Sequence, residues 1–251
     1  MSSVSALQSQ RLFTSLASGK RINSAADDAA GLAISEKLLT QTNGYSVGTN
    51  NAADGINLMN VADGALSGMQ DSLQRIRELA VQAGNGIYSA SDKEMIQMEI
   101  DGLKQSIQDI AKGTEFNTMK LLDGSMASLS LATNPSGGGL EIQMANSTLD
   151  SLGIADFDVT GKFSLDDIDN AIKTVSKARS KFGAKTNALS HTMNYNANAG
   201  LNLMAANSRI RDTEYGNAVI NRNKQNVLSQ YRMFAMKAQM NQNAGVLKLL
   251  G

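Results

Sequence analysis

The chain contains no cysteine and no tryptophan, and its single proline is Pro135. Without cysteine, neither disulfides nor thiolate metal sites can form. Aromatic residues make up only 4% of the 251 residues. So few large side chains argue against a thick globular core, whereas Ala, Leu, Ile, Met and Gln suit long, thin helices that pack pairwise.

The chain also lacks an excess of either charge and a long apolar run. It has 23 basic and 23 acidic residues, so no overall field favours nucleic acid or an anionic membrane as a partner. No apolar run approaches the roughly 20 residues of a membrane helix. The first eight residues lack the charged n-region and apolar centre of a secretory signal peptide, which alone predicts a cytoplasmic protein.

What the chain does have is a heptad pattern, within a predicted helix from about residue 28 to residue 83. Two apolar series recur every seven positions, offset by three: Met59, Leu66, Leu73 and Ala80, and Ala62, Met69, Ile76 and Ala83. This a/d seam is typical of helices wound around partners. Gly44, Gly48 and Gly55 each weaken the helix by about 1 kcal/mol, so we expect partner helices to hold it there.

Three further helices are predicted. The first starts at a capping box formed by Ser91 and Glu94 and ends near Gly113. Its apolar stripe has spacings of four and three and comprises Ile96, Ile100, Leu103, Ile107 and Ile110. The others run from a capping-box-like start at Ser164 to about Ser208, and from about Thr213 to Gly245.

Residues 114–163 lose the helical period. Short apolar alternations at 129–132 and 140–144 flank a stretch rich in glycine, which predicts a β-hairpin region. Helices at both ends and hairpins in the middle define the expected fold class as mainly α. We predict a long antiparallel helical rod or coiled coil with a small β-hairpin region at the tip.

Candidate catalytic residues all have a structural interpretation. His191 is the only histidine, so the H-E-x-x-H zinc pattern is absent. Asp27 and Asp28 are paired carboxylates, but Ser24 and Asp27 have the spacing of a helix start. Gly137–Gly139 lack the lysine of a phosphate-binding loop. No catalytic, cofactor-binding or metal-binding residue is predicted, and we do not expect an enzyme.

Five blocks of the sequence resemble, in order, blocks of the bacterial flagellins. They are SGKRINSAADDAAGLAISEK at 18–37, LQRIRELAVQAGN at 73–85, EFNTMKLLDG at 115–124, NSRIRD at 207–212 and GVLKLLG at 245–251. The resemblance implies a structural subunit that polymerises into the bacterial flagellar filament for swimming motility. It also implies export through the flagellum's own channel and an extracellular location, in place of the cytoplasmic one.

The resemblance implies two domains. Residues 1–23 and 209–251 would form a terminal helical domain in the filament's inner core, and residues 24–208 a helical rod with the β-hairpin region around 114–163. An apolar stripe is expected to be exposed on a lone subunit and buried in the assembled core. It comprises Ile220, Val227, Tyr231, Phe234, Val246, Leu247, Leu249 and Leu250.

A second surface is implied on the rod. It would contact neighbouring subunits along a protofilament, and a host Toll-like receptor on monomers. Its residues are Leu73, Gln74, Arg75, Arg77, Glu78, Leu79 and Glu99. The partners implied are further copies of the chain, a flagellin export chaperone, and the filament cap and hook-associated proteins. Neither nucleic acid nor membrane is expected as a partner.

The sequence departs from the family at its start, where only 17 residues precede Ser18. Flagellins usually carry a longer amino-terminal helix, so we expect an asymmetric inner helix pair. The short middle predicts a filament without large outer domains. Two alternatives stay open. One is a hook–filament junction protein, which should form short caps. The other is a secreted form whose main role is engaging the receptor.

Overall fold

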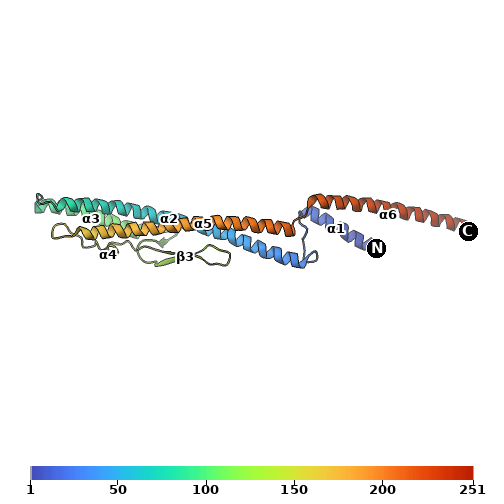
Figure 1. The fold of residues 1–251 in the computed structure, drawn as a ribbon, viewed down its shortest axis with the longest axis horizontal. Coiled ribbons are helices and arrows are strands. Elements are labelled where there is room, and N and C mark those ends of the chain that lie inside the picture. Colours follow the sequence, from blue (N-terminus) through green and yellow to red (C-terminus); the bar gives the residue numbers. More distant parts are fainter. Residues whose placement is uncertain (1, 251) are drawn as a thin grey trace. The chain divides into compact units, whose positions relative to one another are not determined.

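The computed structural model describes residues 2–250, with the side chains of residues 10–244. Its elements in chain order are α1 (Ser2–Ser18), α2 (Ala29–Ala83), α3 (Ala90–Gly113), β1 (Glu115–Phe116), β2 (Met119–Lys120), β3 (Ser128–Ala132), β4 (Gly139–Gln143), α4 (Leu149–Leu152), α5 (Leu165–Arg211) and α6 (Tyr215–Leu250) (Figure 1). The chain divides into two compact units. We call Asn43–Gly200 the central unit, and Met1–Thr42 with Leu201–Gly251 the terminal unit.

The core of the central unit is the predicted heptad seam of α2. All eight seam residues from Met59 to Ala83 are at most 1% exposed. Ile100 and Ile107 from α3 and Phe182 from α5 are buried in the same cluster. Burying a side chain of this size stabilises a fold by about 1.5–3 kcal/mol. The seam is therefore confirmed. It is buried largely by other helices of the same chain.

Helix α3 is capped two residues earlier than predicted, at Ser89 instead of Ser91. The N-cap is Ser89, whose hydroxyl accepts from the Asp92 amide at 3.2 Å, while the Asp92 carboxylate accepts from the Ser89 amide at 2.9 Å. The predicted pair of Ser91 and Glu94 is wrong. Two Ser-x-x-acid patterns overlap here, and the earlier one gives the helix two more residues to bond.

The other helix boundaries shift by a few residues from those predicted. Helix α5 does follow Ser164, whose hydroxyl accepts from the Asp166 amide at 3.1 Å, but it continues past Ser208 to Arg211. Helix α6 starts two residues after Thr213 and continues past Gly245 to Leu250. Within the described residues, no helix is both long enough and apolar enough to span a bilayer.

The predicted hairpin is confirmed, but its predicted place at the tip is wrong. Strands β3 and β4 pair antiparallel, from Ser128 opposite Gln143 to Ala132 opposite Gly139. The hairpin lies along the flank of α2 and α5, where Asn51 donates to the Ala132 carbonyl at 2.7 Å. The tip of the central unit is instead the connection between α2 and α3 (Figure 1).

The helical glycines explain this position. A β-carbon on Gly48 would lie 2.4 Å from the carbonyl oxygen of Thr133, and one on Gly44 would lie 2.7 Å from the Pro135 β-carbon. One on Gly55 would lie 2.3 Å from a methyl carbon of Leu131. The glycine face of α2 was expected to meet partner helices, but most of these contacts come from the hairpin. Glycine is needed there because the hairpin backbone approaches the helix backbone closely.

A second, shorter hairpin was not predicted. Strands β1 and β2 pair with Phe116 opposite Met119, and the two residues between them, Asn117 and Thr118, have φ of 48° and 65°. Positive φ at both central positions is the geometry of a type I′ turn. The sequence signal is weak because the usual Asn-Gly is replaced by Asn-Thr, and a β-branched residue rarely adopts this conformation.

In the terminal unit, helices α1 and α6 pack against each other and run antiparallel (Figure 1). The two segments that follow α1 and α5 are joined by a short antiparallel bridge between Lys20 and Asp212. The amide of Arg21 donates to the Arg211 carbonyl at 2.7 Å, and the amide of Thr213 donates to the Gly19 carbonyl at 2.9 Å. These bonds tie the two ends of the chain together within this unit.

Candidate assembly surfaces

The first candidate surface is one face of α6. Ile220, Val227, Tyr231 and Phe234 recur at spacings of seven, four and three, which places them on one side of a helix. Their exposed fractions are 64%, 64%, 74% and 76%. The prediction that this stripe is exposed on a lone subunit is confirmed for these four residues. Exposed apolar surface of this kind marks a contact surface.

Helix α6 carries a second apolar face that the sequence analysis missed. Tyr215, Met233, Met236 and Met240 are each at least 59% exposed. At 100° per residue they fall on the side of the helix opposite the first face. The signal was present as three methionines at spacings of three and four. Helix α6 therefore exposes apolar residues on two opposite sides.

Four further residues of the predicted stripe, Val246, Leu247, Leu249 and Leu250, have side chains outside the described residues. The backbone of α6 is helical through Leu250. Their part in a contact surface therefore stays a prediction.

The second candidate surface is the charged patch on α2 and α3. The Arg75 guanidinium donates to Glu99 on α3 from Nη2 at 2.8 Å and from Nε at 3.0 Å, and from Nη1 to Glu78 at 3.2 Å. The hydrogen bonds to Glu99 raise the pKa of Arg75 the most, and the one to Glu78 raises it further. Arg77 points away from this pair and bonds Asp169 of α5 at 2.7 Å.

Two predicted members of the patch do not lie on its surface. Leu73 is 0% exposed and Leu79 is 2% exposed, and both belong to the core of the central unit. They hold α2 in place rather than facing a partner. Gln74, Arg75, Arg77, Glu78 and Glu99 are the members that are exposed.

Two of the five signature blocks meet in the terminal unit. Ser35, in the block at 18–37, donates its hydroxyl to the Asn207 side-chain oxygen at 2.6 Å. Arg211, in the block at 207–212, bonds Glu36 at 3.1 Å. The Arg21 guanidinium donates to the Ile210 carbonyl at 2.6 Å. The two blocks thus contact each other directly in the fold, although about 170 residues separate them in the sequence.

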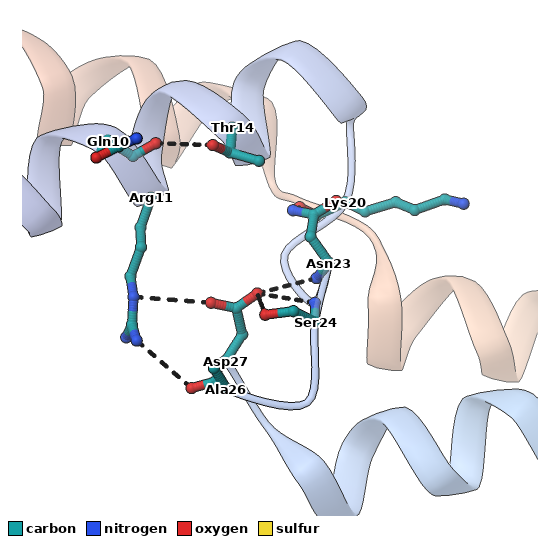
Figure 2. A network of polar contacts seen from close by, with 8 residues as sticks. All are labelled: Gln10, Arg11, Thr14, Lys20, Asn23, Ser24, Ala26 and Asp27. Atoms are coloured by element: carbon teal, nitrogen blue, oxygen red, sulfur yellow. Dashed lines mark hydrogen bonds and ion pairs between the residues drawn. The ribbon is translucent and has the colours of Figure 1, made fainter.

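A polar network fixes the turn that precedes α2 (Figure 2). The Asp27 carboxylate accepts from the amides of Ser24 at 3.0 Å and Asn23 at 3.2 Å, and from the Ser24 hydroxyl. The Ser24 and Asn23 amide bonds lower the pKa of Asp27, and Arg11 of α1, 3.7 Å away, adds a smaller contribution. The network joins α1 to the loop that starts α2.

The predicted helix start at Ser24 and Asp27 is therefore corrected. These two residues close a turn, and α2 begins at Ala29. Asp28 takes the capping role, because its carboxylate accepts from the Gly31 amide at 2.8 Å. Both carboxylates thus satisfy backbone amides.

The other candidates for chemistry are also in structural positions. His191 is exposed on α5, and Gly137 has φ of 83° in the turn of the β3–β4 hairpin. Across the described residues, no three His, Asp or Glu side chains are grouped so that they could hold a metal ion.

Comparison with known proteins now identifies the family. Residues 3–127 match the bacterial flagellin N-terminal helical region, and residues 165–250 match the bacterial flagellin C-terminal helical region. A flagellin of Halalkalibacterium halodurans is 40% identical over 251 residues, covering 97% of this chain and 92% of that protein. The chain belongs to the bacterial flagellin family. It is a structural subunit of the flagellar filament.

Solved structures agree on the fold. The crystal structure of Bacillus cereus flagellin has a TM-score of 0.53 and 27% identity, covering 59% of this chain and 88% of that one. A putative flagellar hook-associated protein from Vibrio parahaemolyticus has a TM-score of 0.62 over 74% of this chain and all of that one, at 14% identity. That second likeness shows a shared fold alone. The family matches favour a filament subunit over a hook–filament junction protein.

Proposed function

We propose that both faces of α6 form the inner assembly surface of the filament. The observation that carries this proposal is the exposure of apolar residues on two opposite sides of one long helix. A subunit in a helical polymer has neighbours on several sides, so both faces can be covered at once. In this proposal, residues 1–23 and 209–251 form the inner-core domain, and residues 24–208 form the surrounding rod with its hairpins at 114–163.

We further propose that the work of the subunit is mechanical and needs no catalytic group. The buried seam of α2 stiffens the central unit, and neighbouring copies transmit torque through their contacts. The exposed charged patch around Arg75 and Glu99 is the contact along a protofilament. On a free subunit the same patch is the surface offered to a host Toll-like receptor.

The other proposed partners are an export chaperone, the filament cap and the hook-associated proteins. They are inferred from the exposed apolar face of α6 that contains Ile220, Val227, Tyr231 and Phe234. Before assembly, we propose, this face is covered by an export chaperone, and the subunit passes through the flagellum's own channel to an extracellular filament. There it meets the filament cap and the hook-associated proteins. These proposals are supported by apolar surface that a free subunit in water would leave uncovered.

The test is polymerisation of the purified chain seeded with filament fragments. Phe234→Ser on the first face and Met240→Ser on the second should each raise the critical concentration. Burial of such a side chain is worth about 1.5–3 kcal/mol, and each 1.4 kcal/mol is tenfold, so we expect rises of about 10- to 100-fold. Gln239→Ser lies between the two faces and is the matched control.

Three results would contradict the proposal. If the wild-type chain forms no filament on seeds, self-assembly through this helix fails. If Gln239→Ser is as damaging as Phe234→Ser, the loss is a general effect on α6. If Met240→Ser assembles normally, the second face has no role. Circular dichroism of each variant should show unchanged helix content, because these side chains are exposed.

A further inference from the structure

The chain contains two Asn-Gly pairs, at Asn43-Gly44 and at Asn85-Gly86. Both asparagines are exposed, but their backbones differ. Asn43 lies inside α2, where Gly44 packs against Pro135 of the hairpin. Asn85 lies in the connection between α2 and α3, and a β-carbon on Gly86 would meet no atom within 4 Å.

We propose that Asn85 is a site of spontaneous deamidation, and that Asn43 is protected from the same reaction by the fold. The reaction belongs to the chain itself and needs no enzyme or cofactor. The inference is independent of the proposed assembly surfaces, because it depends only on the conformation of the connection at residues 84–89.

The step balances without an oxidant or reductant. A base in solvent removes the Gly86 amide proton, the Gly86 nitrogen forms a bond to Cγ of Asn85, and the bond from Cγ to Nδ2 breaks. Nδ2 takes up a proton from solvent and leaves as ammonia, and a five-membered succinimide remains. Water then opens the ring at either carbonyl, which gives aspartate or isoaspartate and adds one negative charge.

Two features of the connection favour this reaction at Asn85. Within the described part of the chain, the Gly86 amide donates no hydrogen bond, so no partner has to be lost before it attacks. The Asn85 side-chain oxygen accepts from the Ile87 amide at 3.3 Å. That donor points at the oxygen on which negative charge develops when Cγ is attacked, and such donors stabilise the transition state.

The helical conformation of α2 slows the reaction at Asn43. There the Gly44 amide is part of the helical hydrogen-bond ladder and follows a residue in helical conformation. Attack requires that a turn of α2 opens and that Pro135 withdraws from Gly44. Every 1.36 kcal/mol of opening free energy slows the reaction tenfold. We therefore expect Asn43 to react at least about tenfold more slowly than Asn85.

The product would alter the connection. The carbonyl of Asn85 accepts from the Tyr88 amide at 3.3 Å, and its amide donates to the Gln82 carbonyl at 3.0 Å. Isoaspartate inserts a methylene into the backbone between these two bonds. A long-lived subunit would accumulate this change, with an added negative charge, at the tip of the central unit.

The experiment is peptide mapping by mass spectrometry of the intact full-length chain, incubated at 37 °C at neutral and mildly alkaline pH. We expect the mass gain of deamidation in the Asn85 peptide, faster at higher pH, and at least about tenfold less in the Asn43 peptide. In guanidinium chloride the two rates should converge, because the fold no longer distinguishes two Asn-Gly pairs.

Gly86→Ala is the sharp variant. Its β-carbon meets no neighbour, so the fold is kept, but the added methyl hinders attack by the residue-86 nitrogen. Deamidation of Asn85 should fall at least about tenfold while Asn43 is unchanged. Equal rates at the two sites in the folded chain would overturn the proposal. So would an Asn85 rate that rises as strongly on unfolding as that of Asn43.

Discussion

The side-chain amide of Asn196 on α5 donates to the carbonyl oxygen of Thr133 at 2.8 Å, beneath the β3–β4 hairpin. Asn196 is 1% exposed and Thr133 is 4% exposed. The same carbonyl lies against Gly48 of α2. One backbone oxygen therefore connects the hairpin to two helices. Removing the hydrogen bond from Asn196 should lower the stability of the fold measurably.

Asn196→Ala should lower the free energy of unfolding by about 1–3 kcal/mol, because it leaves the buried Thr133 carbonyl without its donor. Chemical denaturation followed by circular dichroism measures the change. Asn198→Ala, exposed on the same helix, is the control and should be neutral or slightly stabilising. Equal effects of the two variants would show that the buried hydrogen bond contributes nothing.

Gly48→Ala should destabilise the chain although alanine is the better helix former. Its β-carbon would lie 2.4 Å from the Thr133 oxygen, so the hairpin must move away. Gly64→Ala is the matched control on the same helix, since its β-carbon meets nothing within 4 Å. The control should gain up to about 1 kcal/mol. Thermal melts that shift in the same direction for both variants would contradict the docking.

Stability should fall in acid, in part through the cap of α3. The Ser89 hydroxyl and amide hold the pKa of Asp92 below its ordinary value of 3.8. A carboxyl with a lowered folded-state pKa stabilises above its unfolded pKa, and this contribution is lost as the pH falls through the folded one. Asp92→Asn should therefore lower the melting temperature at pH 7, and the difference from wild type should vanish well below pH 3.8.

Glu94→Gln is the control for the cap. Glu94 was expected to close the capping box, but among the described residues it makes no hydrogen bond. Its replacement should leave the melting temperature unchanged at both pH values. A larger loss at Glu94 than at Asp92 would restore the predicted box.

Arg75→Glu should impair polymerisation more than folding. The bonds of Arg75 with Glu99 and Glu78 are exposed, and such pairs stabilise a fold by about 0–1 kcal/mol. If the patch contacts a neighbouring subunit, the seeded growth rate should fall while the melting temperature moves by a few degrees at most. Lys112→Glu reverses an exposed charge elsewhere on α3 and should grow normally.

The charge-swapped variant Arg75→Glu with Glu99→Arg separates two interpretations. It restores the pair within the subunit but presents reversed charges to a neighbour. Continued poor growth would support an intersubunit contact. Full recovery would mean that the patch acts only within its own subunit.

Much of the fold was readable because it rests on local patterns. The seam from Met59 to Ala83 follows from a seven-residue period, and the β3–β4 hairpin follows from an interruption of that period. The α6 stripe was also predicted to be exposed on a lone subunit, from its apolar spacing and from the resemblance to flagellins, and Ile220, Val227, Tyr231 and Phe234 are exposed. The second α6 face was missed, because its methionines were judged as helix formers rather than as a surface.

The sequence determined the family through its signature blocks. It determined the long helices, the seam of α2 and one apolar face of α6 through periodicity and composition, which are properties of neighbouring residues. It could not place the hairpin on Gly44, Gly48 and Gly55 or choose Ser89 over Ser91 as a cap. Nor could it show that the blocks at 18–37 and 207–212 are hydrogen-bonded to each other. Only the tertiary structure decided these points, because close backbone approach and paired hydrogen bonds depend on residues far apart in the chain.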